Sequence, residues 1–563
     1  MNLKKIFIIF FILLFIFGVS IRIFSINKDY SAEEVDFVKA SAAIKETGHP
    51  IFYHSEQKPV DLALYHPPMY IFLVSLSMMI IKGEVGVRIV NLVFSFLTSI
   101  FIFLFCSQII KNEKGKIIGL VSSALFLINY YAFSSSVLID IDMLSCFFVF
   151  GFIFFILKSY QTNKKTFSFL AGLFLFFSIA NRFIIAGIVY IGIGIYYLIN
   201  KELRKDFKKY FLIGFFACLF FFIVWFVYSQ FIEHISIFYF IQHNIMLGEA
   251  QFSSFLVYAG SFILNISQII RLLTFPVIFL GILSIAYFLK QRKKLTNILL
   301  IYFSVIFIFF LAVPRPAFGY PRYFLSLMPA LFILIGIFIY KTLKDFQITK
   351  KYYLVLLLSL LMSFVLLFAL KPQVTIYAND GLIKATNFPD FFFNILASTP
   401  LLFALFFRTD RKRIMILILL VLTLSYSIYF DLKFVMHDSH IKETGEYIKS
   451  ITNESDIIIT PKAIGYYTKR KFFVNDHYKP AIKDASYSFL IEYFKKSLKN
   501  RNMDDEFFWA GGIYAGTGFD KYYPTKEQLS KASYIILNYK IKNADYEKKI
   551  GDFYIYKLNQ LNF

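Results

Sequence analysis

The chain has 563 residues, of which 58% are hydrophobic, 20% aromatic and only 17% charged, a composition outside the range of soluble globular proteins. Its formal net charge is +23, but the Lys and Arg residues gather in short connections between long apolar runs. A nucleic-acid surface would interleave basic and aromatic residues on one folded face. Composition therefore predicts a polytopic membrane protein that binds no nucleic acid.

The first apolar run, residues 6–26, follows Lys4 and Lys5 and has no small-residue cleavage site. This pattern is typical of an uncleaved membrane anchor and not of a signal peptide. Along the whole chain about 13 apolar runs approach or exceed the length that spans a bilayer as a helix. They lack the polar–apolar alternation of barrel strands. The sequence therefore predicts an α-helical bundle with about 13 transmembrane helices.

Cations lie in alternate connections between these runs, at residues 111–116, 158–165, 200–209, 290–294, 341–351 and 408–413. By the positive-inside rule these connections and the N-terminus face the cytoplasm. An odd number of spans sends the chain after residue 431 to the other side. We therefore expect an integral protein of the cytoplasmic (inner) membrane, with a first outer loop at residues 27–85 and an outward-facing C-terminal domain at 432–563.

The first outer loop begins with the acidic sequence "DYSAEEVDF". Within it, "SAEE" predicts a capping box, with Ser31 as the N-cap and Glu34 three residues later, and a helix that ends near Gly48. Acids in a first helical turn also complement the helix dipole, so a purely structural interpretation of Glu33 and Glu34 is an alternative to a catalytic one. The following run "IFLVSLSMMII" is too short to span and predicts a helix in the membrane surface.

Other charged residues fall at the outer ends of predicted spans. Asp140 and Asp142 lie where a helix begins in "SSSVLIDIDMLSCFF", and Arg182 interrupts the apolar sequence "SIANRFII". Arg315 and Arg322 lie in "VPRPAFGYPRYFLSLMPAL". Carboxylates at a membrane boundary are costly and indicate function, although Asp is also favoured at helix starts. Arginines on the cation-poor side indicate a fixed anion such as phosphate, with snorkelling to lipid headgroups as the alternative.

Taken in order, these motifs resemble the GT-C superfamily of glycosyltransferases that use lipid-phosphate sugars, in particular the branch with the protein O-mannosyltransferases and the lipid A aminoarabinose transferase. Members have an Asp-Glu pair in the first outer loop and a short helix ending in Gly. Here "EEVDFVKASAAIKETG" fills that frame, so Glu33 matches the Asp and Glu34 the Glu. "YHPPMY" with His66 matches the next motif, and "VRIVN" with Arg88 the one before the second span.

Later motifs extend the resemblance over nearly the whole chain. "IDMLSCFF" brings Asp142 onto the second acidic motif, and "PRYFLSLMPAL" matches with Arg322 and Tyr323. The sequence departs from the family pattern at two positions. Glu33 stands where Asp is usual, which leaves the nearby Asp29 and Asp36 as alternatives for the base. Arg182, after Asn181, stands where many members have a Lys, so that role carries over only as a positive charge.

The resemblance implies transfer of a sugar from a polyprenyl-phosphate donor to a lipid, glycan or protein acceptor at the outer membrane face, with inversion. It implies Glu33 as the base that accepts the acceptor's proton, beside Glu34. Asp142 would orient the acceptor or sugar. The donor phosphate would be surrounded by the side chains that match the remaining motifs, namely His66, Arg182, Arg322 and Tyr323. This chemistry requires no cofactor; the alternative that "DID" holds a divalent metal has little support from a lone acidic pair.

Residues 1–431 are thus predicted to form the GT-C catalytic domain, and 432–563 a small α/β domain. In the latter, "HIKETGEYIKSI" and "ASYSFLIEYFKKSLKN" predict helices and "DIIIT", "ASYIILNY" and "DFYIYKL" predict strands. All three cysteines fall within apolar runs, so neither a disulfide framework nor a cysteine metal site is expected. Three other functions stay open: a ligase that uses lipid-diphosphate donors, a transporter or flippase, and a non-catalytic scaffold.

Overall fold

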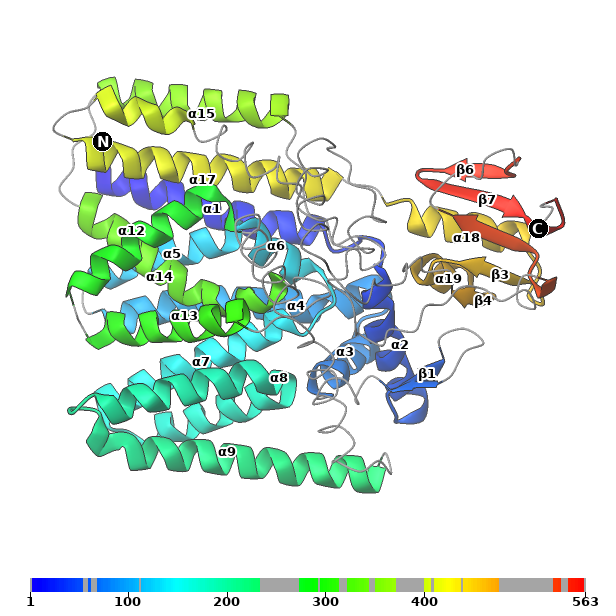
Figure 1. Cartoon of the computed structure of the whole chain (residues 1–563), viewed down its shortest axis with the longest axis horizontal. Helices are drawn as coiled ribbons and strands as arrows, with labels where there is room; N and C mark the ends of the chain where they lie inside the picture. The colour runs from blue at the N-terminus through cyan, green and yellow to red at the C-terminus, as the bar shows by residue number, and fades with distance from the viewer. Residues whose placement is uncertain are drawn as a thin grey trace, which may run out of the picture.

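The computed structural model describes residues 3–53, 59–61, 68–110, 113–232, 273–291, 294–312, 321–343, 350–370, 399–406, 410–436, 439–474, 530–537 and 545–560. Its larger part is a bundle of apolar helices that run side by side (Figure 1). These helices are α1 (Leu3–Phe24), α4 (Glu84–Ile109), α5 (Glu113–Ile128), α7 (Asp142–Thr162), α8 (Lys165–Ile199), α9 (Phe207–Val227), α12 (Phe275–Gln291), α13 (Lys294–Ala312), α14 (Met328–Leu343), α15 (Lys350–Leu370) and α17 (Arg411–Met436).

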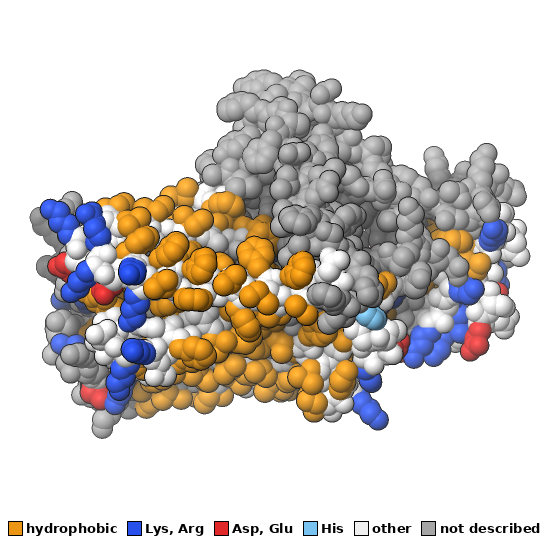
Figure 2. All heavy atoms as spheres, turned by 90° about the horizontal axis from the view of Figure 1, so that it is seen from below, with side chains coloured by type: hydrophobic (Ala, Val, Ile, Leu, Met, Phe, Trp, Pro, Cys, Tyr) orange, Lys and Arg blue, Asp and Glu red, His pale blue; other side chains and the backbone are white. Residues whose placement is uncertain are grey.

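The bundle has the surface of a membrane protein. In the described part of the chain, seven helices are long and apolar enough to cross a membrane, or eight if one bent pair counts as a single span. Figure 2 shows a broad hydrophobic belt with Lys and Arg side chains gathered at one end. Large apolar side chains such as Phe216 and Phe220 on α9 are exposed, and lipid is the solvent that suits them. The total of about 13 spans stays a prediction, because residues 233–272 and 371–398 lie outside the described ranges.

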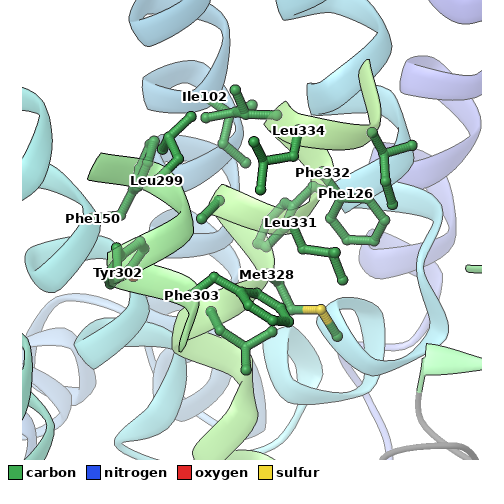
Figure 3. Close-up of a cluster of buried hydrophobic side chains, with 14 of the residues drawn as sticks. Ile102, Phe126, Phe150, Leu299, Tyr302, Phe303, Met328, Leu331, Phe332 and Leu334 are labelled. Carbon is green, nitrogen blue, oxygen red and sulfur yellow. The ribbon is translucent and has the colours of Figure 1, made fainter. Parts of the chain in front are cut away.

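The centre of the bundle is filled by α14. Its side chains Met328, Leu331 and Phe332 are at most 2% exposed. They pack against Phe126 of α5 and Tyr302 of α13 in the cluster drawn in Figure 3. Close packing of this kind fixes the neighbouring helices relative to one another, and with them the helix ends that carry the charged residues.

The chain reverses inside α8. Ser168, near its start, shares a hydrogen bond of 2.7 Å with Ser159 of α7, while Tyr197, near its end, lines the same cavity as Ser159. Both ends of α8 therefore lie at one end of the bundle. The turning point is Arg182, whose backbone is non-helical with φ −154° and ψ 85°. This reversal agrees with the prediction that Arg182 lies at the end of a span.

A second break separates α5 from the short helix α6 (Tyr130–Val137), which is bent by 63° from it. Asn129 lies at the break, and its side-chain oxygen accepts hydrogen bonds from the backbone N–H groups of Tyr131 and Ala132. A side chain that takes the first amides of a helix makes such a corner stable inside an apolar bundle. Beyond the corner, α6 leads into residues 138–141, which precede α7.

The described part of the predicted first outer loop lies between the bundle and the C-terminal domain (Figure 1). It contains α2 (Ala32–Thr47), the antiparallel pair β1 (Ile51–Tyr53) and β2 (Pro59–Asp61), and α3 (Met69–Ile80). The predicted capping box is confirmed, since the Ser31 and Glu34 side chains each take the other's backbone N–H. The predicted end of the helix is confirmed as well, because Gly48 adopts the left-handed conformation with φ 82°.

The C-terminal domain packs α18 (Ile441–Ile451) and α19 (Lys462–Thr468) against a five-stranded sheet of order β4-β3-β5-β7-β6. The strands are β3 (Ile457–Thr460), β4 (Lys471–Val474), β5 (Tyr534–Leu537), β6 (Lys548–Ile550) and β7 (Phe553–Lys557). β3 pairs in parallel with β4 and β5, and β7 antiparallel with β5 and β6.

The predicted fold class, a polytopic α-helical membrane protein with a small C-terminal α/β domain, is confirmed. The expected helix at "HIKETGEYIKSI" and the three expected strands are present as α18, β3, β5 and β7. The helix expected at residues 485–500 lies outside the described residues. The boundary at 431/432 stays a prediction. Short 3-10 and π segments complete the described chain: η2 (Arg204–Asp206), η3 (Tyr228–Ile232), η4 (Pro321–Leu327), η5 (Thr399–Phe406) and η6 (Leu558–Gln560).

Candidate active site

The segment between α6 and α7 is held by three buried side chains from two other helices, α4 and α8. Arg88 of α4 donates from Nη1 to the carbonyl of Val137 at 2.6 Å. Asn91, one turn later on α4, donates from Nδ2 to the carbonyl of Asp140 at 2.8 Å, and Asn181 of α8 donates to the carbonyl of Ile141 at 2.8 Å. Backbone groups without water need such partners. The start of α7 is therefore tied to α4 and α8.

Glu34 of α2 forms the link from the first outer loop to this segment. Its Oε1 lies 2.7 Å from Nη1 of Arg88, with side chains that are 3% and 1% exposed. The same oxygen accepts the N–H of Ile139 at 2.9 Å, and Oε2 accepts the N–H of Ser31 at 2.7 Å. Both carboxylate oxygens thus have donors, as a buried charge requires.

Arg88 completes the link from its other nitrogen. Its Nη2 donates to the carbonyls of Lys28 and Asp29, both at 2.9 Å. Its guanidinium carbon lies 5.2 Å from the centre of the Tyr30 ring. One arginine therefore joins the residues before α2 to the residues before α7, a task for which its fork of donors is suited.

Asp142 and Arg182 form a second buried ion pair. Nη1 of Arg182 contacts Oδ1 of Asp142, and the two side chains are 10% and 1% exposed, respectively. Asp142 is the first residue of α7, where the helix dipole stabilises a carboxylate. Arg182 lies at the reversal of α8. The structure therefore brings together two residues that the sequence singled out from different spans.

The segment η4 is anchored beside the first turns of α7. Sγ of Cys146, one turn after Asp142, contacts the carbonyl of Leu325 at 3.6 Å, and the Tyr302 hydroxyl of α13 donates to the carbonyl of Ser326. The backbone of Arg322 and Tyr323 belongs to η4. The predicted phosphate-binding segment thus runs next to the helix that begins with Asp142, although these two side chains are outside what is described.

Three other predicted residues also lie outside the description. Glu33 belongs to the first turn of α2, but its side chain is not described. His66 and Arg315 lie outside the described residues altogether. The roles predicted for the Glu33, His66, Arg322 and Tyr323 side chains therefore stay predictions.

The other acids of the first outer loop bind elsewhere. Oδ2 of Asp29 accepts the N–H groups of Ile441 and Lys442 at the start of α18, at 3.1 and 3.2 Å. Oδ2 of Asp36 lies 2.6 Å from Nζ of Lys462 in α19. Both alternatives for the base therefore contact the C-terminal domain.

Asn91 is the residue that the sequence interpretation missed. It is 1% exposed and bonds two carbonyls of the segment before α7, those of Leu138 and Asp140. The available signal was a lone amide inside the apolar run "VRIVNLVF". A polar group within a membrane helix is expensive unless it has partners, and this one has them.

Within the described ranges, no three His, Cys, Asp or Glu residues gather as metal ligands would. Oδ1 of Asp140 accepts the N–H of Ile141 at 2.6 Å, whereas Asp142 faces Arg182. A cavity of about 340 Å³ lies at the far end of α7, lined by residues such as Tyr160, Tyr197 and Lys209, and is remote from the charged pairs.

Comparison with known proteins agrees with the motif series. Residues 65–228 match the family model for dolichyl-phosphate-mannose-protein mannosyltransferases. ArnT from Cupriavidus metallidurans bound to undecaprenyl phosphate is similar over 82% of this chain and 85% of its own, with a TM-score of 0.59 and 13% sequence identity. The chain therefore shares the fold of this ArnT structure, and its residues 65–228 resemble the mannosyltransferase family. The resemblance predicted from the motifs is thereby confirmed.

Two further solved structures match less closely. Apo ArnT from the same organism has a TM-score of 0.48 with 13% identity, and covers 82% of this chain and 85% of its own. The arabinosyltransferase EmbB from Mycobacterium smegmatis has a TM-score of 0.44 with 12% identity, and covers 75% of this chain and 40% of its own. The fold assignment rests on the ArnT match above 0.5. No curated protein matches the chain in sequence.

Proposed function

We propose that this GT-C protein is a glycosyltransferase that moves a sugar from a polyprenyl-phosphate donor to a lipid, glycan or protein acceptor at the outer face of the cytoplasmic membrane. The observation that carries the proposal is the buried pair Asp142–Arg182 at the start of α7. The link from Glu34 through Arg88 connects it to the loop that holds Glu33. The GT-C fold and the family match support glycosyl transfer as the reaction.

The reaction is a single displacement. The acceptor hydroxyl oxygen attacks the anomeric carbon, its proton passes to the Glu33 carboxylate, and the bond from that carbon to the phosphate oxygen breaks. Polyprenyl phosphate leaves with the bonding electrons, and the anomeric centre is inverted. The base accounts for a rate gain of about 10² to 10⁴.

Charged neighbours are assigned supporting roles. Arg182 and Arg322, with His66 and Tyr323, stabilise the charge that grows on the leaving phosphate. A guanidinium carries five N–H donors, so one arginine can contact a carboxylate and a phosphate together. Glu34 positions the loop through Arg88 and takes no proton. No metal or other cofactor is assigned to the reaction.

A donor assay tests the function. Purified protein in lipid nanodiscs receives polyprenyl-monophosphate sugars or the matching diphosphate sugars, and the released lipid phosphate is measured by mass spectrometry. We expect release from the monophosphate donor only. Release from the diphosphate donor alone would instead identify a ligase, and movement of intact donor between leaflets without release would identify a flippase.

A further inference from the structure

Asp29 is part of the junction between the first outer loop and the C-terminal domain. Its Oδ2 accepts the N–H groups of Ile441 and Lys442 at 3.1 and 3.2 Å, and Oγ of Ser439 donates to the same oxygen. The N-cap residue His440 makes no side-chain capping hydrogen bond, and the neighbouring Ser439 hydroxyl accepts the N–H of Ile441 at the longer distance of 3.4 Å. A carboxylate more than 400 residues away in sequence thus takes the first amides of α18, where the helix dipole favours a negative charge.

Two ion pairs repeat the same pattern. Asp36 of α2 pairs with Lys462 of α19 at 2.6 Å, and Glu84 at the start of α4 pairs with Lys442 of α18 at 3.0 Å. In each case the acid comes from the membrane part and the amide or cation from the C-terminal domain. The junction is therefore complementary in charge along its length.

Apolar packing joins the same elements. Val35, Phe37 and Val38 of α2 share one buried cluster with Ile448 of α18 and Ile464 of α19. Figure 1 shows α2 between the bundle and these two helices. A helix that shares a core with the C-terminal domain cannot move independently of it without exposing that core.

Tyrosines close the junction next to Asp29. The backbone N–H of Tyr30 donates to the hydroxyl of Tyr467 at 3.0 Å. The two rings are stacked at 5.9 Å between centres, and Tyr466 meets Tyr30 edge-on at 5.5 Å. Tyr30 is also the ring beneath Arg88. Tyr30 thus contacts both the C-terminal domain and Arg88, whose pair with Glu34 connects to the start of α7.

We propose that the C-terminal domain holds α2 in its working orientation and that Asp29 is the positioning residue that fastens it by capping α18. The inference rests on the proposed function in one respect: α2 carries the proposed base, Glu33. It also gives Asp29 a role other than that of a base, because its oxygen serves three donors of the C-terminal domain.

Substitution of Asp29 by Asn and by Ala separates capping from proton transfer. Asn accepts backbone N–H groups at a helix start about as well as Asp, whereas Ala does not. Capping therefore predicts that Asp29→Asn keeps turnover and that Asp29→Ala lowers kcat by about tenfold or more, with little change in KM for the donor. Asp552, an exposed acid in the turn before β7, provides the control Asp552→Ala, with wild-type behaviour expected.

Amide hydrogen exchange on the same full-length variants supplies a readout that is independent of activity. Loss of the cap in Asp29→Ala should speed exchange in α18 and α2 by about fivefold and leave α4 and α7 unchanged. A general loss of stability would instead speed exchange throughout the described helices, and kcat per folded enzyme would stay at the wild-type value; that result would overturn the proposal.

The remaining outcomes are also decisive. An inactive Asp29→Asn with wild-type exchange would make Asp29 a proton acceptor and overturn the positioning role. Wild-type exchange in α2 of Asp29→Ala would show that the domain does not hold this helix. If the wild-type protein released no lipid phosphate, the proposed function would fail, and exchange in α2 and α18 would still decide whether Asp29 fastens them.

Discussion

The two sides of α2 are held by different kinds of contact. Towards the bundle, the Glu34–Arg88 pair is 3% and 1% exposed and surrounded by backbone partners. Towards the C-terminal domain, the side chains of Lys462 and Asp36 are 12% and 20% exposed. Removing one partner of a buried pair costs about 3–5 kcal/mol, whereas partly hydrated pairs contribute about 1 kcal/mol or less. Of the two ion pairs, the one that joins α2 to the bundle is therefore the more costly to break.

Substitutions in the buried Glu34–Arg88 pair, which joins α2 to the bundle, should give the largest loss of stability. Glu34→Ala leaves Arg88 charged and buried, and should lower the free energy of unfolding by about 3–5 kcal/mol. Replacing both residues, as Glu34→Leu with Arg88→Met, should recover much of this loss, because no uncompensated charge remains. Chemical unfolding in detergent measures both variants. A loss below about 1 kcal/mol for Glu34→Ala would show that the pair is hydrated and that the two sides of α2 do not differ.

Loss of Arg182 should lower turnover per folded enzyme, in addition to the stability that is lost when the buried Asp142 is left without its partner. Arg182→Ala should lower kcat by about 10² or more, since it removes a charge near the leaving phosphate. Arg182→Lys should keep only part of the wild-type kcat, because an ammonium group lacks the planar, forked donors of a guanidinium. Steady-state release of lipid phosphate measures both. Equal loss of folded protein and of activity in the two variants would reduce the pair to a structural contact.

Local signals in the sequence predicted where α2 begins and ends. The Ser31–Glu34 capping box and the left-handed Gly48 depend on neighbours within a few residues, so they could be read directly. The start of α7 at Asp142 followed from the same kind of signal. Cation placement likewise indicated that the chain turns near Arg182.

Partners distant in sequence could not be predicted. Asp29 and Ile441 are 412 residues apart, and nothing local to either indicates the other. For the same reason, Asp29 and Asp36 looked like alternatives for the base although both contact the C-terminal domain. The bend between α5 and α6 depends on how Asn129 meets the packed bundle, which is a property of the fold and not of the apolar pattern.

Changes to the Asp36–Lys462 pair between α2 and the C-terminal domain should lower stability less, and a second substitution should restore it. Asp36→Lys places two cations together and should lower the free energy of unfolding by about 1 kcal/mol, with a similar loss for Lys462→Asp. The double variant restores an ion pair of opposite orientation and should regain most of the loss. A double-mutant cycle of unfolding measurements tests this. Strict additivity of the two losses would show that the residues do not interact in solution.

Lys39 of α2 should give an effect that depends on pH. Burial lowers the pKa of Lys39 to about 8, against the opposing influence of Asp36. The unfolded chain therefore holds this proton more tightly, so the charge costs stability below about pH 8, and the cost fades as pH rises towards the ordinary value of 10.5. Lys39→Met should raise the melting temperature at about pH 7, with a gain that shrinks at about pH 10. The Phe472 ring centre lies 5.1 Å from Nζ of Lys39. A gain in melting temperature that stays constant across this pH range would show that it comes from packing against this ring and not from the charge.

Release of polyprenyl phosphate by Glu33→Gln, compared with Glu34→Gln and Glu33→Asp, addresses the chemistry most directly. Glu33→Gln keeps size and removes proton acceptance, so release should fall by about 10² or more with the fold intact. Release by Glu34→Gln should fall less if Glu34 caps and positions α2, because Gln also serves at that position of a capping box. Glu33→Asp should retain activity if the carboxylate position tolerates one methylene. Wild-type release by Glu33→Gln would contradict the assignment of the base to this residue.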